Sequence, residues 1–61
     1  MDKQMIIDNT IDARKLIDEV LAATFDLPRD DRIRAETIYR ATNVLDDIDA
    51  LLNLFEDNGN G

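Results

Sequence analysis

The stretch Asp26-Leu27-Pro28-Arg29-Asp30-Asp31 is the only strong interruption of helical sequence inside the chain, and it decides the fold. Pro28 cannot continue a helix from upstream, because its ring removes the N–H, but it can open a helix as the first residue. The stretch therefore predicts two helices, over about residues 4–26 and 28–56. We expect Asp30 and Asp31 in the first turn of the second helix, where the helix dipole favours carboxylates.

The sequence closes with the acidic tail Asp57-Asn58-Gly59-Asn60-Gly61. Asn58 or Gly59 can adopt the left-handed conformation that commonly ends a helix, so we expect residues 57–61 to be frayed. No internal repeat or low-complexity tract divides the 61 residues, which are expected to form a single domain.

Apolar residues of the second segment recur at steps of three and four, as in an amphipathic helix. They form one series from Ile38 to Phe55 and a second series beside it that includes Val44 and Leu51. Together the two series span an arc of about 140 degrees when residues are placed roughly 100 degrees apart. One neighbouring helix cannot cover so wide an arc.

The first segment is apolar around most of its circumference and keeps only a narrow polar strip. A helix of this kind is buried or lies in an interface, and a lone hairpin has no interior deep enough for it. We therefore predict an all-α fold, an antiparallel two-helix hairpin that dimerises into a four-helix bundle. The predicted core and dimer residues are Ile6, Ile17, Val20, Leu21, Ile38, Leu45, Ile48, Leu52 and Phe55.

Chain length supports the same prediction. A chain of 61 residues buries only about 60% of the surface that its unfolded form exposes. Proteins of this size are commonly stabilised by disulfides, a structural metal or oligomerisation. The chain has no Cys and no His, which leaves oligomerisation.

Charge supports an antiparallel turn and limits the partners. Folding at Pro28 places Arg14 and Lys15 beside residues 43–57, which carry acidic side chains and no basic one. The net charge of −7 disfavours binding to nucleic acid or to an anionic membrane. No apolar run approaches the roughly 18 residues that span a bilayer, and Met1-Asp2-Lys3 is unlike a signal peptide, so we expect a cytoplasmic protein.

The composition argues against catalysis. Nucleophilic catalysis uses Ser, Cys, Thr or Lys with an adjacent base, and this chain lacks Ser, Cys and His. We expect Thr10 and Thr24 to bond back to their own helix. Asp46 and Asp47 point about 100 degrees apart, so they and Asp49 are interpreted as a solvated surface. We predict no catalytic residue, no cofactor and no metal ligand.

A candidate partner-binding surface lies away from the main apolar arc and consists of Arg32, Tyr39, Asn43 and Asp46. An exposed Tyr flanked by Arg is the composition of many interaction hot spots. The alternative is that Tyr39 rims the bundle, with its ring on apolar neighbours and its hydroxyl in water.

The layout resembles the Rop family, small plasmid proteins whose hairpins dimerise into a four-helix bundle and bind RNA. The shared features are the size, the turn near the middle, Lys3-Gln4 at the start, and an acidic tail with Asn and Gly after Phe55. Rop-like RNA binding uses a polar and basic surface of the first helix. Here that strip consists of Asp8, Asp12, Glu19 and Asp26, with Lys15 as its only basic residue.

The leading hypothesis is a homodimeric accessory or inhibitor protein, of phage, plasmid or regulatory type, that binds an unidentified cellular protein. The alternative is a Rop-like hairpin that binds nucleic acid through Arg29, Arg32, Arg34 and Arg40. A third possibility is that the acidic surface imitates a nucleic-acid backbone and occupies a basic groove on another protein.

Overall fold

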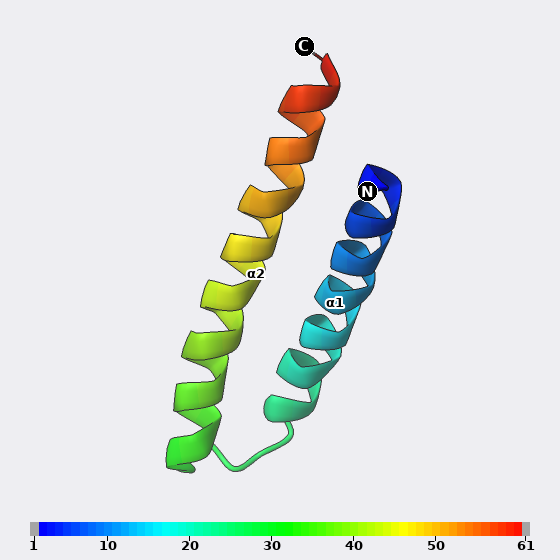
Figure 1. Ribbon diagram of the computed structural model, residues 1–61. Helices are drawn as coiled ribbons and strands as arrows, with labels where there is room; N and C mark the ends of the chain where they lie inside the picture. Colours follow the sequence, from blue (N-terminus) through cyan, green and yellow to red (C-terminus); the bar gives the residue numbers. More distant parts are fainter. Residues whose placement is uncertain (1, 61) are drawn as a thin grey trace.

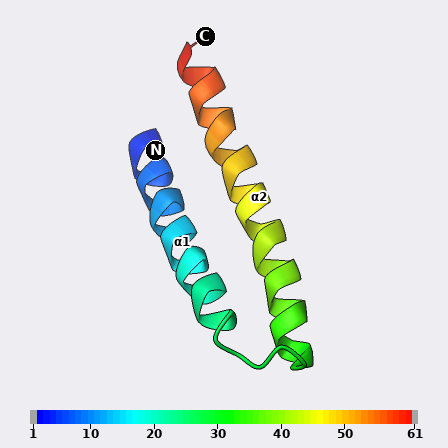
Figure 2. The same cartoon turned by 180° about the vertical axis from the view of Figure 1, so that it is seen from behind.

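A computed structural model describes the backbone of residues 2–60 and the side chains of residues 2–56. It contains two helices, α1 (Lys3–Thr24) and α2 (Arg32–Asn60). They lie side by side and run in opposite directions, with both chain ends away from the turn (Figures 1 and 2). The predicted all-α hairpin is confirmed. It is a rod of 47 × 16 × 14 Å.

α1 is bounded by a side-chain cap at one end and by tight turns at the other. Asp2 Oδ1 accepts a hydrogen bond of 2.9 Å from the backbone N–H of Gln4, an N–H that the helix itself leaves unpaired. After Thr24 the chain tightens, since Asp26 N–H donates to the carbonyl of Ala23 and Leu27 N–H to that of Thr24. The predicted end at residue 26 was therefore two residues late. Leu27, the residue before Pro28, lies outside the helix, in agreement with the extended geometry that a following proline favours.

α2 begins at Arg32, four residues after the predicted start at Pro28. The carbonyl of Pro28 accepts a hydrogen bond of 3.0 Å from Asp31 N–H and closes a turn. Asp31 Oδ1 then accepts a hydrogen bond of 2.8 Å from Ile33 N–H. Asp31 therefore precedes the helix as its N-cap and does not lie in its first turn. Its side-chain oxygen accepts a hydrogen bond from a backbone N–H that the helix leaves unpaired, which the side chain of Pro28 cannot do.

At its other end α2 continues through Asn60, beyond the predicted boundary at residue 56. The fraying of the tail stays a prediction. Gly61 lies outside the described residues. α2 is thus seven residues longer than α1, with 29 residues against 22, and it extends past the start of α1 (Figure 1).

The helices meet along two series of side chains that are less exposed than their neighbours and recur at steps of three and four. We call these residues the facing stripe. It consists of Ile7, Thr10, Arg14, Ile17, Leu21 and Thr24 on α1, and of Arg34, Ile38, Ala41, Leu45, Ile48, Leu52 and Phe55 on α2. Within the described side chains, only Thr24 and Ala41 are buried, at 5% and 7% exposure. The hairpin has a line of contact between its helices but almost no interior.

Candidate interaction surface

The facing stripe divides the hairpin into two long sides. Stepping one residue along a helix rotates the side chain by about 100 degrees. Because both helices are right-handed and run in opposite directions, positions one residue after the stripe meet on one side. Positions one residue before it meet on the other.

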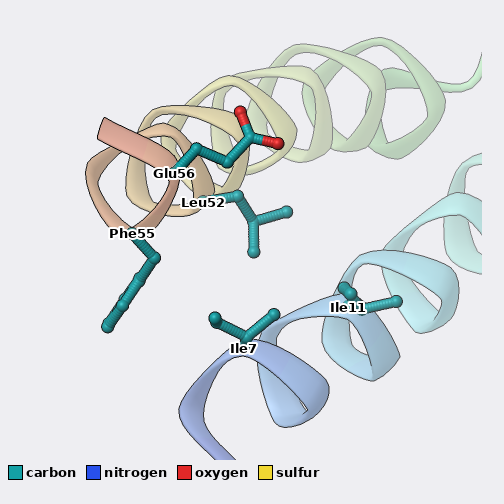
Figure 3. Close-up of a pocket in the computed structure, with 5 residues that line it drawn as sticks. All are labelled: Ile7, Ile11, Leu52, Phe55 and Glu56. Atoms are coloured by element: carbon teal, nitrogen blue, oxygen red, sulfur yellow. The ribbon is translucent and has the colours of Figure 1, made fainter. Parts of the chain in front are cut away.

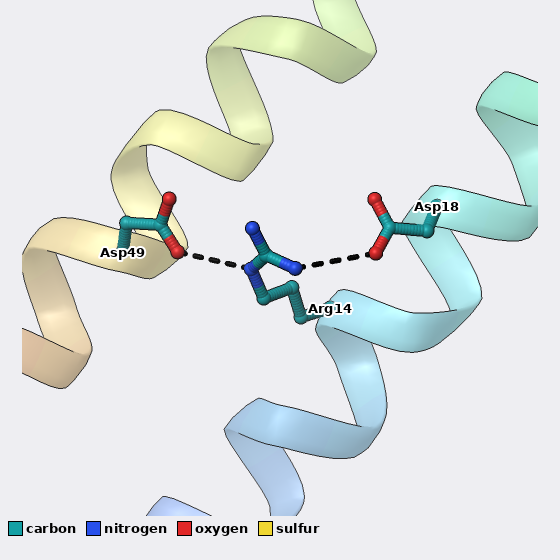
Figure 4. Close-up of polar contacts among 3 residues, drawn as sticks. All are labelled: Arg14, Asp18 and Asp49. Atoms are coloured by element: carbon teal, nitrogen blue, oxygen red, sulfur yellow. Dashed lines mark hydrogen bonds and ion pairs between the residues drawn. The ribbon is translucent and has the colours of Figure 1, made fainter.

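Two observed contacts fix this geometry. The guanidinium of Arg14 bonds to Asp18 on α1 and to Asp49 on α2, each of which follows a position of the facing stripe (Figure 4). Near the open end of the hairpin, Ile11 and Glu56, which also follow the stripe, line one hollow together with Ile7, Leu52 and Phe55 (Figure 3). Positions that follow the stripe on both helices therefore share one side.

We call that side the acidic side. On α1 it carries Asp8, Ile11, Lys15, Asp18 and Ala22, and on α2 it carries Ala35, Tyr39, Thr42, Asp46, Asp49, Asn53 and Glu56. Arg14 projects from the facing stripe toward it. Arg14 Nε lies 3.0 Å from Asp49 Oδ1, and Arg14 Nη1 lies 3.2 Å from Asp18 Oδ2. The hydrogen bond that Arg14 donates to Asp49 and the negative charges of both carboxylates raise the pKa of Arg14. The predicted pairing of Arg14 with the acidic stretch is confirmed.

We call the opposite side the apolar side. On α1 it consists of Ile6, Asn9, Ala13, Leu16, Val20 and Ala23, and on α2 of Ile33, Thr37, Arg40, Val44, Asp47, Leu51 and Leu54. Several of its large side chains are more than half exposed: Leu16 at 61%, Ile33 at 67% and Leu54 at 59%. Arg40 and Asp47 are its only ionisable residues. A contiguous exposed apolar strip on a small protein marks an interaction surface.

The total exposed area is large for a chain of this size. A compact monomer of 7.0 kDa is expected to expose about 4,000 Å², whereas this chain exposes 4943 Å². The excess of about 900 Å² agrees with the elongated shape of the hairpin, whose helices have almost no interior.

The predicted core residues fall on two surfaces. Ile17, Leu21, Ile38, Leu45, Ile48, Leu52 and Phe55 belong to the facing stripe, where they are half-buried. Ile6 and Val20 belong to the apolar side, and Val20 is 46% exposed. The hairpin itself covers the first group and Ile6 incompletely, and it leaves Val20 exposed. Their burial in a dimer stays a prediction.

The four predicted partner-binding residues are all exposed, and Tyr39 is 64% exposed. Tyr39 and Asp46 lie on the acidic side, and Arg32, seven residues before Tyr39, continues the same face of α2. Asn43 lies on the outer surface of α2. None of the four belongs to the apolar side. Their role in partner binding stays a prediction.

The arginines considered for nucleic-acid binding differ in the contacts that their guanidinium groups make. The guanidinium carbon of Arg34 lies 5.4 Å from the centre of the Phe25 ring, and Arg34 Nε is enclosed without a hydrogen-bond partner among the described residues. Arg40 Nε donates a hydrogen bond of 2.7 Å to Glu36 Oε2. Sequence reasoning missed the contact of Arg34 with Phe25. The spacing of four residues between Arg34 and Ile38 indicates only that Arg34 continues the facing stripe, and it does not identify Phe25 as the contact.

No metal centre or membrane span is found in the described part of the chain. Its side chains form no group of three or more Asp, Glu, His or Cys suited to hold a metal ion. Neither helix, as far as the structure describes it, has enough length and apolar character to cross a membrane. Thr10 and Thr24 bond back to the carbonyls of Ile6 and Val20, each at 2.7 Å, as predicted.

Comparison with known proteins finds no matching family model, no matching curated protein and no matching solved structure.

Proposed function

We propose that this chain is a small non-catalytic protein–protein interaction module, and that it works as a homodimer in which two hairpins form a four-helix bundle. The apolar side carries this proposal. Leu16 of α1 and Val44 and Leu51 of α2 lie on that side, and all are exposed. Water contact of this surface is unfavourable by about 25 cal/mol per Å² of apolar area, so a second hairpin that covers it stabilises both copies.

We further propose that the dimer binds a cellular protein in the cytoplasm. This chain would then act as an accessory or inhibitor protein of phage, plasmid or regulatory type. The supporting feature is the set Arg32, Tyr39, Asn43 and Asp46, which is exposed and would stay exposed when the apolar side is covered. Tyr and Arg are the residues most enriched at hot spots. The net charge of −7 favours a basic surface on the partner.

Sedimentation velocity over a concentration series tests the homodimer. We expect the wild-type chain to sediment as a dimer at micromolar concentration. Leu16→Asp places a carboxylate on the apolar side and should shift the chain to a monomer, because an unpaired charge in an interface carries a large desolvation cost. Met5→Asp is the matched control, since Met5 is exposed to the same extent, 60% against 61%, but lies off the apolar side. It should remain a dimer.

A well-folded wild-type monomer at all concentrations would contradict the homodimer, and equal effects of the two substitutions would contradict the role of the apolar side. For the cellular partner, the test compares the proteins retained by wild-type and Tyr39→Ala chains from a lysate of the source cell. A protein retained equally by both chains would contradict the role of Tyr39.

Nucleic-acid binding has less support, because Arg34 packs on Phe25 and Arg40 is paired with Glu36. It predicts a gel shift with structured RNA or duplex DNA that weakens steeply with salt. A shift that Arg29→Ala together with Arg32→Ala abolishes would replace the proposed protein partner by a nucleic acid.

A further inference from the structure

The apolar side carries only two ionisable residues, and their spacing indicates how a second copy docks. Arg40 lies four residues before Val44, and Asp47 lies three residues after it. Two copies of α2 that cross antiparallel at Val44 therefore bring Arg40 of each copy opposite Asp47 of the other. The mismatch is one residue, about 1.5 Å along the helix, which a long arginine side chain spans easily.

From this we infer that the second copy packs with its turn at the opposite end, so that α2 lies along α2 and α1 along α1, with two Arg40–Asp47 ion pairs between the copies. The inference rests on the proposed homodimer and specifies its arrangement. Closed twofold symmetry, the commonest form of homodimer, requires that each such pair occur twice.

The twofold axis that passes Val44 in this arrangement also brings compatible side chains of the two α1 helices together. The Arg14–Asp49 bond and the hollow shared by Ile7 and Phe55 place Val44 level with the segment of α1 between Leu16 and Val20. An axis at that height sets Leu16 opposite Val20 of the second copy. It also sets Ala13 opposite Ala23, two small residues that allow the helices to approach closely. On α2, Ile33 then meets Leu54 of the second copy.

The other twofold arrangement places both turns at the same end, with α1 of each copy on α2 of the other. There Arg40 meets the Ala23 region and Asp47 meets the Leu16 region, so both charges lie against apolar side chains. A charge buried without a partner is strongly unfavourable, whereas complementary charges across an interface favour one orientation over others. The two residues thus discriminate between the arrangements.

Arg40 is able to form the second pair without losing its first. It bonds to Glu36 through Nε alone, and its side chain is 74% exposed. The two terminal NH₂ groups of the guanidinium can therefore donate to another carboxylate. Within one chain, Arg40 and Asp47 are seven residues apart, about 10 Å along α2, so they do not pair with each other.

Charge reversal tests the ion pairs. Arg40→Asp and Asp47→Arg, each alone, set like charges opposite one another twice and should weaken self-association by about tenfold or more. Mixing the two variants should restore a dimer made of one copy of each, since every pair is then complementary. Arg40→Ala, which removes a charge without reversing it, should weaken association less, and mixing it with Asp47→Arg should restore association less than Arg40→Asp does, because only one of the two pairs is then complementary.

Crosslinking tests the orientation, and the absence of Cys from the chain makes single-cysteine variants unambiguous. With a short bis-maleimide, Val44→Cys should crosslink to itself, and Leu16→Cys should crosslink to Val20→Cys. Mixed Val44→Cys and Leu16→Cys should give no preferential crosslink between the two variants.

These experiments distinguish a failure of the inferred arrangement from a failure of the proposed homodimer. If wild-type chain sediments as a dimer, but Val44→Cys crosslinks only to Leu16→Cys, the turns lie at the same end and only the arrangement is overturned. Failure of the mixed charge variants to associate would also overturn it. If wild-type chain never self-associates, the proposed homodimer itself fails.

Discussion

The two long sides of the hairpin consist of residues only two positions apart in each helix, one just after and one just before the facing stripe, yet their chemistry differs. The acidic side carries Asp18, Asp49 and Glu56, and Arg14 bridges two of these carboxylates. The apolar side carries exposed Leu and Val instead. Both sides follow from the same spacing of three and four. Periodicity alone therefore predicts that two helices meet, and the residues on either side of the meeting line predict which side takes a further partner.

The two sides also contribute to the stability of the fold in different ways. Charges on the acidic side are exposed to water, where ion pairs favour one alignment of the helices more than they add stability. Apolar side chains contribute by leaving water, and on the apolar side this contribution is realised only when a second molecule arrives. Substitutions on the facing stripe, the apolar side and the acidic side should therefore have effects of decreasing size.

The largest effect is expected on the facing stripe. Ile48→Asp should unfold the hairpin and abolish self-association together, at a cost of about 3 kcal/mol or more, because the carboxylate has no partner in the contact line. Leu45→Asp should behave alike. Far-UV circular dichroism and sedimentation measure the two losses. Asn53→Asp, which adds the same carboxylate to the exposed acidic side, is the control. A helical Ile48→Asp chain would mean that the stripe is less important than its position suggests.

The next largest effect is expected from dimerisation through the apolar side, and it can be measured on the wild-type chain. If folding and dimerisation are coupled, the unfolding midpoint depends on protein concentration. Each tenfold rise in concentration should stabilise the dimer by about 1.4 kcal/mol, because association is favoured by mass action. Thermal unfolding followed from micromolar to millimolar concentration measures it. A midpoint that does not move over this range would indicate that each hairpin is stable alone.

A smaller effect is expected on the acidic side, where Arg14→Gln should lower the unfolding temperature by a few degrees. A double-mutant cycle with Asp49→Asn should give a larger coupling than one with Asp18→Asn, since Asp49 contributes most to the raised pKa of Arg14. Added salt should reduce both couplings. Equal couplings would indicate that the contact between the helices is no stronger than the one within α1.

The pH dependence of this pair follows from the direction of the same shift. A base with a raised pKa in the folded state stabilises fully below its ordinary pKa and loses that contribution only as the pH rises through the raised value. Arg14 is therefore charged in acidic, neutral and moderately alkaline solution. The contribution of the Arg14 charge to the coupling should stay constant there and should fall only as the pH rises through the raised pKa of Arg14.

The sequence predicted the hairpin because its decisive signals are local. Pro28 interrupts the helical pattern wherever the rest of the chain lies, and the spacing from Ile38 to Phe55 fixes the contact surface of α2. The helix ends were less predictable, because several residues compete for one role. Asp30 and Asp31 can each cap a helix, and the turn closed by Pro28 selects Asp31. At the far end, Asn58 and Gly59 favour a stop, yet α2 continues through Asn60.

The packing of Arg34 on Phe25 was not predictable in the same way. It depends on where the turn carries the end of α1 relative to the start of α2, and residue spacing within one helix does not contain that information. The candidate partner surface falls between these cases. Spacing predicted that Tyr39 lies outside the apolar arc, and the structure places it there, exposed. What binds to it is not encoded in spacing at all.

The smallest effect on stability is therefore expected from Tyr39→Ala, which should change the free energy of unfolding by no more than about 0.5 kcal/mol, because an exposed side chain outside the contact line supports little packing. Its dimerisation should equal that of the wild-type chain, since Tyr39 lies off the apolar side, while retention of a cellular partner should fall. Urea unfolding, sedimentation and the lysate comparison measure these three quantities on one variant. Tyr39→Phe keeps the ring and distinguishes a contact made by the aromatic surface from one made by the hydroxyl. If Tyr39→Ala instead destabilised the hairpin by more than about 1 kcal/mol, the ring would be packing on its own bundle, and the acidic side would contribute to folding in the way here assigned to the facing stripe.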